Sequence, residues 1–293
     1  MSVLKQLGFT VSIFLLTAHS VAAQLNASQS RRLIARVAGA ELPTKAIRVK
    51  RIPNGSSPEV TAEIQTAFRF EQNADGDWTV REVRVAPDRW EDVGLISEAT
   101  GAQSTTDACT VAEPAEGGTL SVRRARCLLA ALFRVTLPSD NVRISSLSAM
   151  NIPFATSPSA IVGASVTLDF RFAALARDGM QIVAIRGGNS GWIEIARVRS
   201  NIDQIKGRRA LSELQTVADA LGQFRLSRGY YVQADKHTVL VDFLSPMYLS
   251  RVIRVDPWHT PYEYLGERDC FTLRSAGPDR KTNTPDDLLV SNP

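Results

Sequence analysis

Hydrophobic and polar positions divide the chain into three parts. Residues 7–18 form one short apolar run. Between residues 24 and 200, stretches with helical periodicity alternate with stretches in which every second residue is apolar, as in strands. From residue 201, apolar residues recur at three- and four-residue spacing. This spacing predicts an amphipathic helix that ends at Arg228-Gly229, because glycine suits a helix C-cap. The whole pattern predicts an α+β protein.

Residues 1–23 are typical of a signal peptide. Lys5 gives the charged start, the apolar run follows, and Val21-Ala22-Ala23 supplies small residues before a cleavage site at Gln24. An uncleaved anchor helix is the alternative, but the run is shorter than a bilayer span requires. We therefore expect a periplasmic or secreted protein with no membrane span in its mature chain.

The region 24–200 contains two stretches that resemble each other. Arg31–Ile52 and Arg126–Leu147 align at a shift of 95 residues, and each changes at Leu-Pro from a helical pattern to a strand pattern. We predict two small α+β repeats, about residues 27–98 and 120–200; the alternative is chance similarity.

A second match follows at a shift of 102 residues. Phe68-Arg69-Phe70 corresponds to Phe170-Arg171-Phe172, and Trp90 corresponds to Trp192. Alternating phenylalanines face one side of a strand, so we expect them and the tryptophans in the core, with the arginines facing solvent.

Composition and cysteine content narrow the possible functions. The 293 residues are 44% hydrophobic and 22% charged, with a net charge of +4, and basic residues are scattered. This distribution argues against nucleic-acid binding. Export permits disulfides, and Cys109–Cys127 is the favoured bridge because it closes a short loop. Three unpaired thiols are the alternative.

Catalytic motifs give no support for an enzyme. The sequence contains no GxSxG, HExxH or GxxxxGK[ST] motif. Gly188-Asn189-Ser190-Gly191 is similar to the surroundings of a protease serine, but no histidine of the expected mature chain precedes Ser190. We therefore expect a non-enzymatic protein.

In the expected C-terminal domain, residues 201–293, the long helix is followed by a Tyr-Tyr turn, by Asp256-Pro257-Trp258 with Pro261-Tyr262, by a strand at Phe271-Thr272-Leu273 and by a closing loop rich in aspartate. This run, about residues 205–290, resembles the globular domain of the type II secretion major pseudopilin, the protein G family. His259 and Arg280 stand where the family usually has glycine. The family's transmembrane stalk is missing before the helix. The resemblance implies a helix packed on an antiparallel sheet.

The resemblance also implies that the closing loop binds calcium. Asp279, Asp286 and Asp287 supply carboxylates, while Ala276 can offer a backbone carbonyl and Thr282 a hydroxyl. Ca²⁺ prefers six to eight such oxygen ligands. The alternative is a solvated acidic tail without a metal.

These features together predict an exported envelope protein. Its role would be binding or assembly with protein partners, linked to type II secretion or pili, and with no nucleic acid. The rival hypothesis is a periplasmic ligand-binding protein whose cleft lies between the two α+β repeats.

Overall fold

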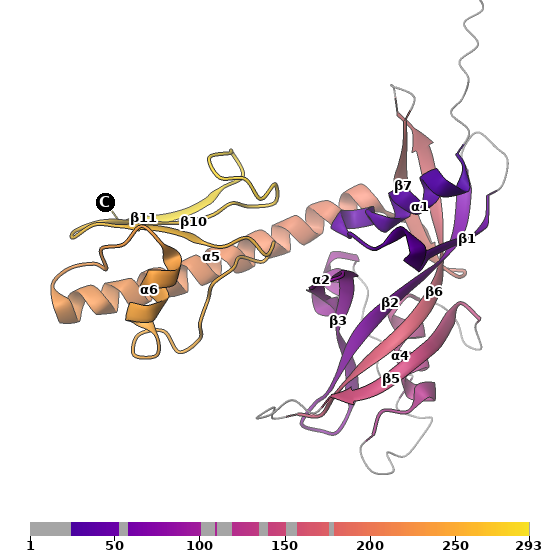
Figure 1. Cartoon of the computed structure of the whole chain (residues 1–293), viewed down its shortest axis with the longest axis horizontal. Helices are drawn as coiled ribbons and strands as arrows, with labels where there is room; N and C mark the ends of the chain where they lie inside the picture. Colours follow the sequence, from indigo (N-terminus) through magenta and orange to yellow (C-terminus); the bar gives the residue numbers. More distant parts are fainter. Residues whose placement is uncertain are drawn as a thin grey trace, which may run out of the picture.

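The computed structural model describes residues 25–52, 58–100, 109, 119–134, 140–150, 157–175 and 179–292. The expected signal peptide, residues 1–23, lies outside these residues. Figure 1 shows two parts joined by one long helix, α5 (Ile195–Arg228). The larger part is built on an eight-stranded sheet and the smaller on a three-stranded sheet. This architecture confirms the α+β prediction.

The larger part repeats one order of elements. Its first half contains α1 (Ala27–Ala35), two 3-10 turns η1 (Val37–Gly39) and η2 (Thr44–Ala46), β1 (Ile47–Arg51), β2 (Glu59–Gln72), β3 (Trp78–Ala86), β4 (Arg89–Asp92) and α2 (Val93–Thr100). Its second half contains α4 (Val122–Leu132), β5 (Val142–Met150), β6 (Ser159–Ala174), β7 (Met180–Gly187), β8 (Ile193–Glu194) and then α5. Each half thus runs from a helix through four strands to a helix.

The two halves join edge to edge in one antiparallel sheet. The strand order is β4-β3-β2-β6-β7-β8, while β1 also pairs with β2 and β5 with β6. The pairs of the β2–β6 ladder are related by the shift of 102 residues. Phe68 pairs with Val162, and their counterparts at this shift, Phe170 and Val60, pair with each other. Ile64 and Val166, which are themselves 102 residues apart, pair with each other, so an approximate two-fold axis passes through this pair.

The irregularities of the sheet also correspond. The β2–β3 ladder shifts register between Arg69 and Phe70, and the β6–β7 ladder shifts between Arg171 and Phe172. The β1–β2 and β5–β6 ladders likewise shift at positions 95 residues apart. Matching bulges favour the interpretation of two repeats. Whether they arose by duplication stays a prediction.

One face of this sheet carries the first hydrophobic core. Phe68, Phe70, Phe170 and Phe172 are completely buried, as their alternation predicts. Helices α1 and α4 contribute side chains to the same core, among them Ile34 and Leu129. Since alternate residues of a strand point to opposite faces, the other face carries polar and charged side chains.

The tryptophans differ from the sequence prediction. Trp90 and Trp192 are half-buried rather than in the core. Arg69 and Arg84 stack on Trp90, with each guanidinium carbon 4.9 Å from a ring centroid. Arg171 and Arg186 stack on Trp192 in the same way, at 4.1 and 4.4 Å. The prediction of buried tryptophans is wrong because each ring packs between arginines on the charged side of the sheet.

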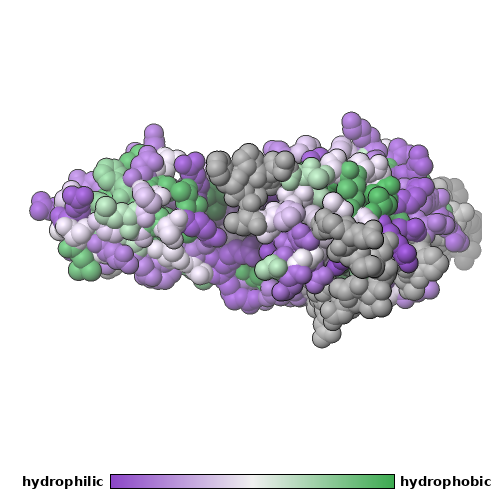
Figure 2. Space-filling model, turned by 90° about the horizontal axis from the view of Figure 1, so that it is seen from below, coloured by the Kyte–Doolittle hydropathy of each residue, from purple (hydrophilic) through white to green (hydrophobic). Residues whose placement is uncertain are grey.

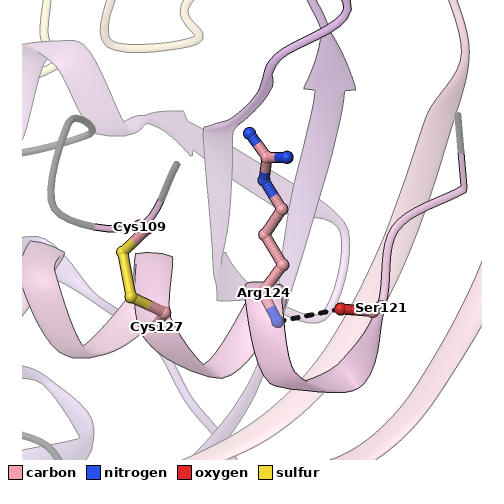
Figure 3. The surroundings of a disulfide bond; sticks show 4 residues. All are labelled: Cys109, Ser121, Arg124 and Cys127. Atoms are coloured by element: carbon pink, nitrogen blue, oxygen red, sulfur yellow. Dashed lines mark hydrogen bonds between the residues drawn. A yellow bond between two sulfur atoms is a disulfide. The ribbon is translucent and has the colours of Figure 1, made fainter. Parts of the chain in front are cut away.

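Local signals fix helix α4 (Figure 3). The Ser121 hydroxyl accepts a hydrogen bond from the Arg124 backbone N–H at 3.1 Å, which caps the helix start. Cys127 on α4 forms a disulfide with Cys109, with their Cα atoms 5.9 Å apart. The predicted bridge is therefore confirmed, and Cys270 is free.

Helix α5 runs from the larger part, where it contacts α2 and β7, into the second hydrophobic core. It begins at Ile195, so the boundary expected between residues 200 and 201 falls inside it. It ends where predicted, with Gly229 at a φ of 80°. Its apolar face packs on α6 (His237–Leu244) and on the sheet of β9 (Glu263–Gly266), β10 (Phe271–Ser275) and β11 (Leu288–Asn292).

Candidate functional site

A buried carboxylate organises the chain between α6 and β9. Asp256 is 2% exposed. Its Oδ1 accepts hydrogen bonds from the backbone N–H groups of Trp258 at 3.0 Å and Thr260 at 2.8 Å. Its Oδ2 accepts a 2.6 Å hydrogen bond from the Ser275 hydroxyl on β10. The Asp-Pro-Trp segment is therefore tied to the start of the closing loop.

The same segment reaches back to the larger part of the molecule. The Trp258 indole N–H donates to Asp203 of α5 at 3.1 Å. The His259 Nε2 lies 3.3 Å from a carboxylate oxygen of Glu91 on β4. Glu91 also pairs with Lys206 of α5 at 2.9 Å. These contacts join the two parts through side chains as well as through α5.

The three predicted carboxylates of the closing loop lie around one hydroxyl. The Thr284 Oγ1 is 2.7 Å from Asp286 Oδ1, 3.3 Å from Asp287 Oδ1 and 3.4 Å from Asp279 Oδ1. The loop thus brings together the three carboxylates that the sequence singled out. Thr284, which holds the centre, was missed, although it is a hydroxyl residue only two positions before Asp286.

Backbone groups hold the outer sides of these carboxylates. Asp279 accepts from the Lys281 N–H at 2.8 Å, and Asp287 accepts from the Asn283 N–H at 2.8 Å. Asp286 accepts from the Asp279 N–H at 3.1 Å. The Thr284 hydroxyl and this N–H lower the pKa of Asp286, because both stabilise its charged form.

Among the described residues, neither of the two remaining predicted ligands is hydrogen-bonded to the three carboxylates. Ala276 is 2% exposed and directly follows β10. Thr282 is half-buried, and Thr284 takes the place among the carboxylates that was expected for Thr282. Gly277 has a φ of 64°, and a Cβ there would lie 2.3 Å from the Asp286 carbonyl oxygen. The loop therefore closes tightly against its own start.

Within the described residues, no three His, Cys, Asp or Glu side chains are arranged as a metal centre. The loop as described is held by Thr284 and backbone N–H groups. A cation at this position would have to replace the hydrogen bonds of the Thr284 hydroxyl. The donor set suits calcium because it consists of oxygen atoms, most of them from carboxylates.

This combination of helix, Asp-Pro-Trp segment and closing loop has a counterpart among known families. Residues 197–292 match the family model of type II secretion system (T2SS) protein G. The resemblance expected for the C-terminal third is thereby confirmed. No curated protein and no solved structure matches the chain.

The protein G-like domain begins within the first turn of α5 and ends in β11. The preceding residues, with the eight-stranded sheet, lie outside the match. Among the described residues, none of the helices is long and apolar enough to cross a membrane.

Proposed function

We propose that this protein is an exported, non-enzymatic component of the cell envelope that assembles with type II secretion proteins through its protein G-like domain. The observation that carries the proposal is the family match over residues 197–292. That family is a structural part of the secretion system and not an enzyme family. The eight-stranded sheet would serve as a further binding module placed ahead of α5.

Exposed apolar residues support an assembly role for this domain. Leu226 is 90% exposed, Met247 78% and Phe243 54%. Figure 2 shows hydrophobic patches on the half of the surface that belongs to this domain. Exposed apolar patches commonly mark contact sites for other proteins.

Capture of secretion proteins tests this role. We expect the purified full chain to bind a T2SS pseudopilin in a direct two-component assay. Phe243→Ser with Met247→Ser should weaken the binding at least tenfold, because it removes apolar area from the contact. Val122→Ser is the matched control, since Val122 is 56% exposed on α4. No binding to any pseudopilin, or equal loss in the control, would reject the proposal.

We further propose that the closing loop binds calcium through Asp279, Asp286 and Asp287, with Ala276 and Thr282 as additional oxygen donors. Support comes from the convergence of the three carboxylates on Thr284. Bound calcium would remove the repulsion between these charges and stabilise the loop.

A melting experiment on the full chain tests the calcium site. A ligand that binds only the folded state adds about 2.7 kcal/mol at a hundredfold excess over Kd. We expect calcium to raise the melting temperature and a chelator to lower it. Asp286→Asn should abolish this response, whereas Asp219→Asn on α5 should keep it. Identical melting curves with calcium and with chelator would leave the loop as a solvated acidic segment.

The rival hypothesis expects a ligand-binding cleft between the two repeats, but the two repeats share one continuous sheet. Where the repeats meet, β2 and β6 form an unbroken ladder from Glu59–Arg171 to Glu71–Ser159. A continuous sheet leaves no cleft between the two strands. A ligand site in this region would have to lie over the face of the sheet.

A further inference from the structure

An apolar cavity lies over the centre of the eight-stranded sheet. Its volume is about 250 Å³. Its floor includes the central pair Ile64 and Val166, and its walls come from α2, the start of α5, η1 and the end of α4. Apart from Val198, the lining lies in the part of the chain outside the protein G match.

The lining follows the approximate two-fold axis. Positions 102 residues apart contribute matched apolar side chains from the two repeats. The pairs are Ile64 and Val166, Val83 and Ile185, Val93 and Ile195, and Ile96 and Val198. The cavity therefore arises from the symmetric arrangement of the two repeats, and not from a packing defect at one residue.

The core is incomplete at this point and reaches solvent. Ile64, Val83 and Ile185 are only half-buried, whereas Phe68 and Phe170 on the same face are completely buried. Well-packed interiors have few voids larger than a water molecule. Apolar surface that water reaches gains stability when an apolar molecule covers it.

Three arginines belong to the cavity lining, and the guanidinium groups of two of them, Arg84 and Arg186, lie on the charged side of the sheet. The charged residues among its described lining are Arg84, Arg134 and Arg186. Arg84 and Arg186 stack on the tryptophans, and Arg186 also pairs with Asp169 at 3.0 Å. Arg134, at the end of α4, is exposed. Arg134 is therefore the lining residue that can offer a positive charge to an anionic group at the rim.

We propose that this cavity binds a single medium-length alkyl chain that carries an anionic head group, as in a free fatty acid. An apolar cavity of roughly 150 Å³ can hold benzene, and a water-sized group needs roughly 30 Å³. The observed volume therefore suits a chain of about eight such groups. The chain lies against the aliphatic lining, and the carboxylate faces Arg134.

Binding of octanoate to the full-length protein tests the site. Isothermal titration should show one octanoate per chain. Ile96→Phe on α2 should abolish the binding, because the larger ring fills the cavity. Ile161→Phe is the matched control: the same change at a half-buried position of β6 that lies outside the lining. We expect this control to bind as the unmodified protein does.

A second arm tests the head group. Arg134→Gln should weaken octanoate binding three- to tenfold and leave 1-octanol binding unchanged. Circular dichroism confirms that each variant is folded. Failure of the unmodified protein to bind octanoate, or full binding by Ile96→Phe, would overturn the site. Equal binding of octanoate by Arg134→Gln would overturn the assignment of the head group. Pseudopilin binding should be unaffected by Ile96→Phe, which separates this site from the proposed assembly role.

Discussion

His259 and Arg280 are two of the five described non-glycine residues whose backbone conformation favours glycine. His259 has a φ of 67° and Arg280 a φ of 59°. Both stand where the protein G family usually has glycine, so the backbone follows the family pattern while the side chains differ. In this left-handed region a residue with a Cβ is strained by roughly 1–2 kcal/mol. His259 offsets part of this strain through its contact with Glu91.

Arg280→Gly should therefore stabilise the protein. We expect a gain of up to about 1 kcal/mol in the free energy of unfolding, because the strain disappears, while the greater freedom of glycine in the unfolded chain offsets part of that gain. Lys281→Gly is the control, since Lys281 lies outside the set of residues with positive φ and should lose stability. Urea denaturation measures both changes, and a loss with Arg280→Gly would contradict the argument.

The burial of His237 makes the folded state less stable at acidic pH. His237 is 6% exposed, and burial lowers its pKa to about 4. The unfolded state, with a histidine pKa near 6.5, binds the proton more strongly. The contribution of neutral His237 to the free energy of unfolding is therefore complete above about pH 6.5 and is lost as the pH falls towards 4. The largest loss from this residue is about 3 kcal/mol.

His237→Phe should flatten this part of the pH profile. Phenylalanine keeps the ring packing against Tyr262 and removes the buried Nε2, which has no hydrogen-bond partner among the described residues. The free energy of unfolding, measured from pH 7 to pH 4.5, should fall less steeply than in the unmodified protein. An unchanged slope would show that other groups cause the pH dependence.

At the scale of elements, each repeat carries the same stack of tryptophan between two arginines. The first stack joins β2 to β3 and β4, and the second joins β6 to β7 and to Trp192, which directly precedes β8. A cation over an aromatic face contributes about 0.5–1 kcal/mol at exposed sites. Each stack thus clamps the outer strands of its half onto the long central strand.

Because the stacks correspond, their removal should cost similar amounts. Trp90→Leu and Trp192→Leu should each lower the free energy of unfolding by about 1–2 kcal/mol. Trp78 is 4% exposed in the core, so Trp78→Leu should cost more. Guanidinium denaturation of the three variants provides the comparison. A difference above about 1 kcal/mol between the first two would argue against equivalent roles.

Local signals made several elements predictable. Glycine at the end of α5 and the alternating phenylalanines of β2 and β6 depend on neighbouring residues only. The edge-to-edge ladder was not predictable, because it pairs residues about 100 positions apart. The positions of the tryptophans were predicted wrongly because a large aromatic residue is usually assigned to the core, and the sequence does not show that arginines stack on the ring. In the closing loop the carboxylates could be chosen by type, but Thr284 became evident only from the turn that surrounds it.

At the scale of the whole molecule, α5 contacts both parts: it packs against α2 and β7 at its start and enters the second core further along. Its 34 residues span about 50 Å. Lys206, near its middle, is 6% exposed and pairs with Glu91 of β4. The position of the protein G-like domain therefore depends on a charge pair that is largely removed from water.

Breaking this pair should be costly. Glu91→Gln should lower the free energy of unfolding by about 3 kcal/mol, because it leaves Lys206 buried without a countercharge. Glu91→Gln combined with Lys206→Met should recover much of the loss. Glu98→Gln is the control, since the Glu98–Arg208 pair is exposed and should contribute less than about 1 kcal/mol. Additive effects of Glu91→Gln and Lys206→Met would contradict the coupling.

The central β2–β6 ladder has a consequence for the order of folding. β2 has only its own half to pair with until β6 is available, and Glu59 and Arg171 are 112 positions apart. Contacts of such large sequence separation form slowly. During synthesis, the edge of β2 that later pairs with β6 therefore stays unpaired until β6 has been made. Such an edge is prone to bind other strands. A fragment that ends after α2 should then pair β2 with a second copy, giving a dimer centred on Ile64.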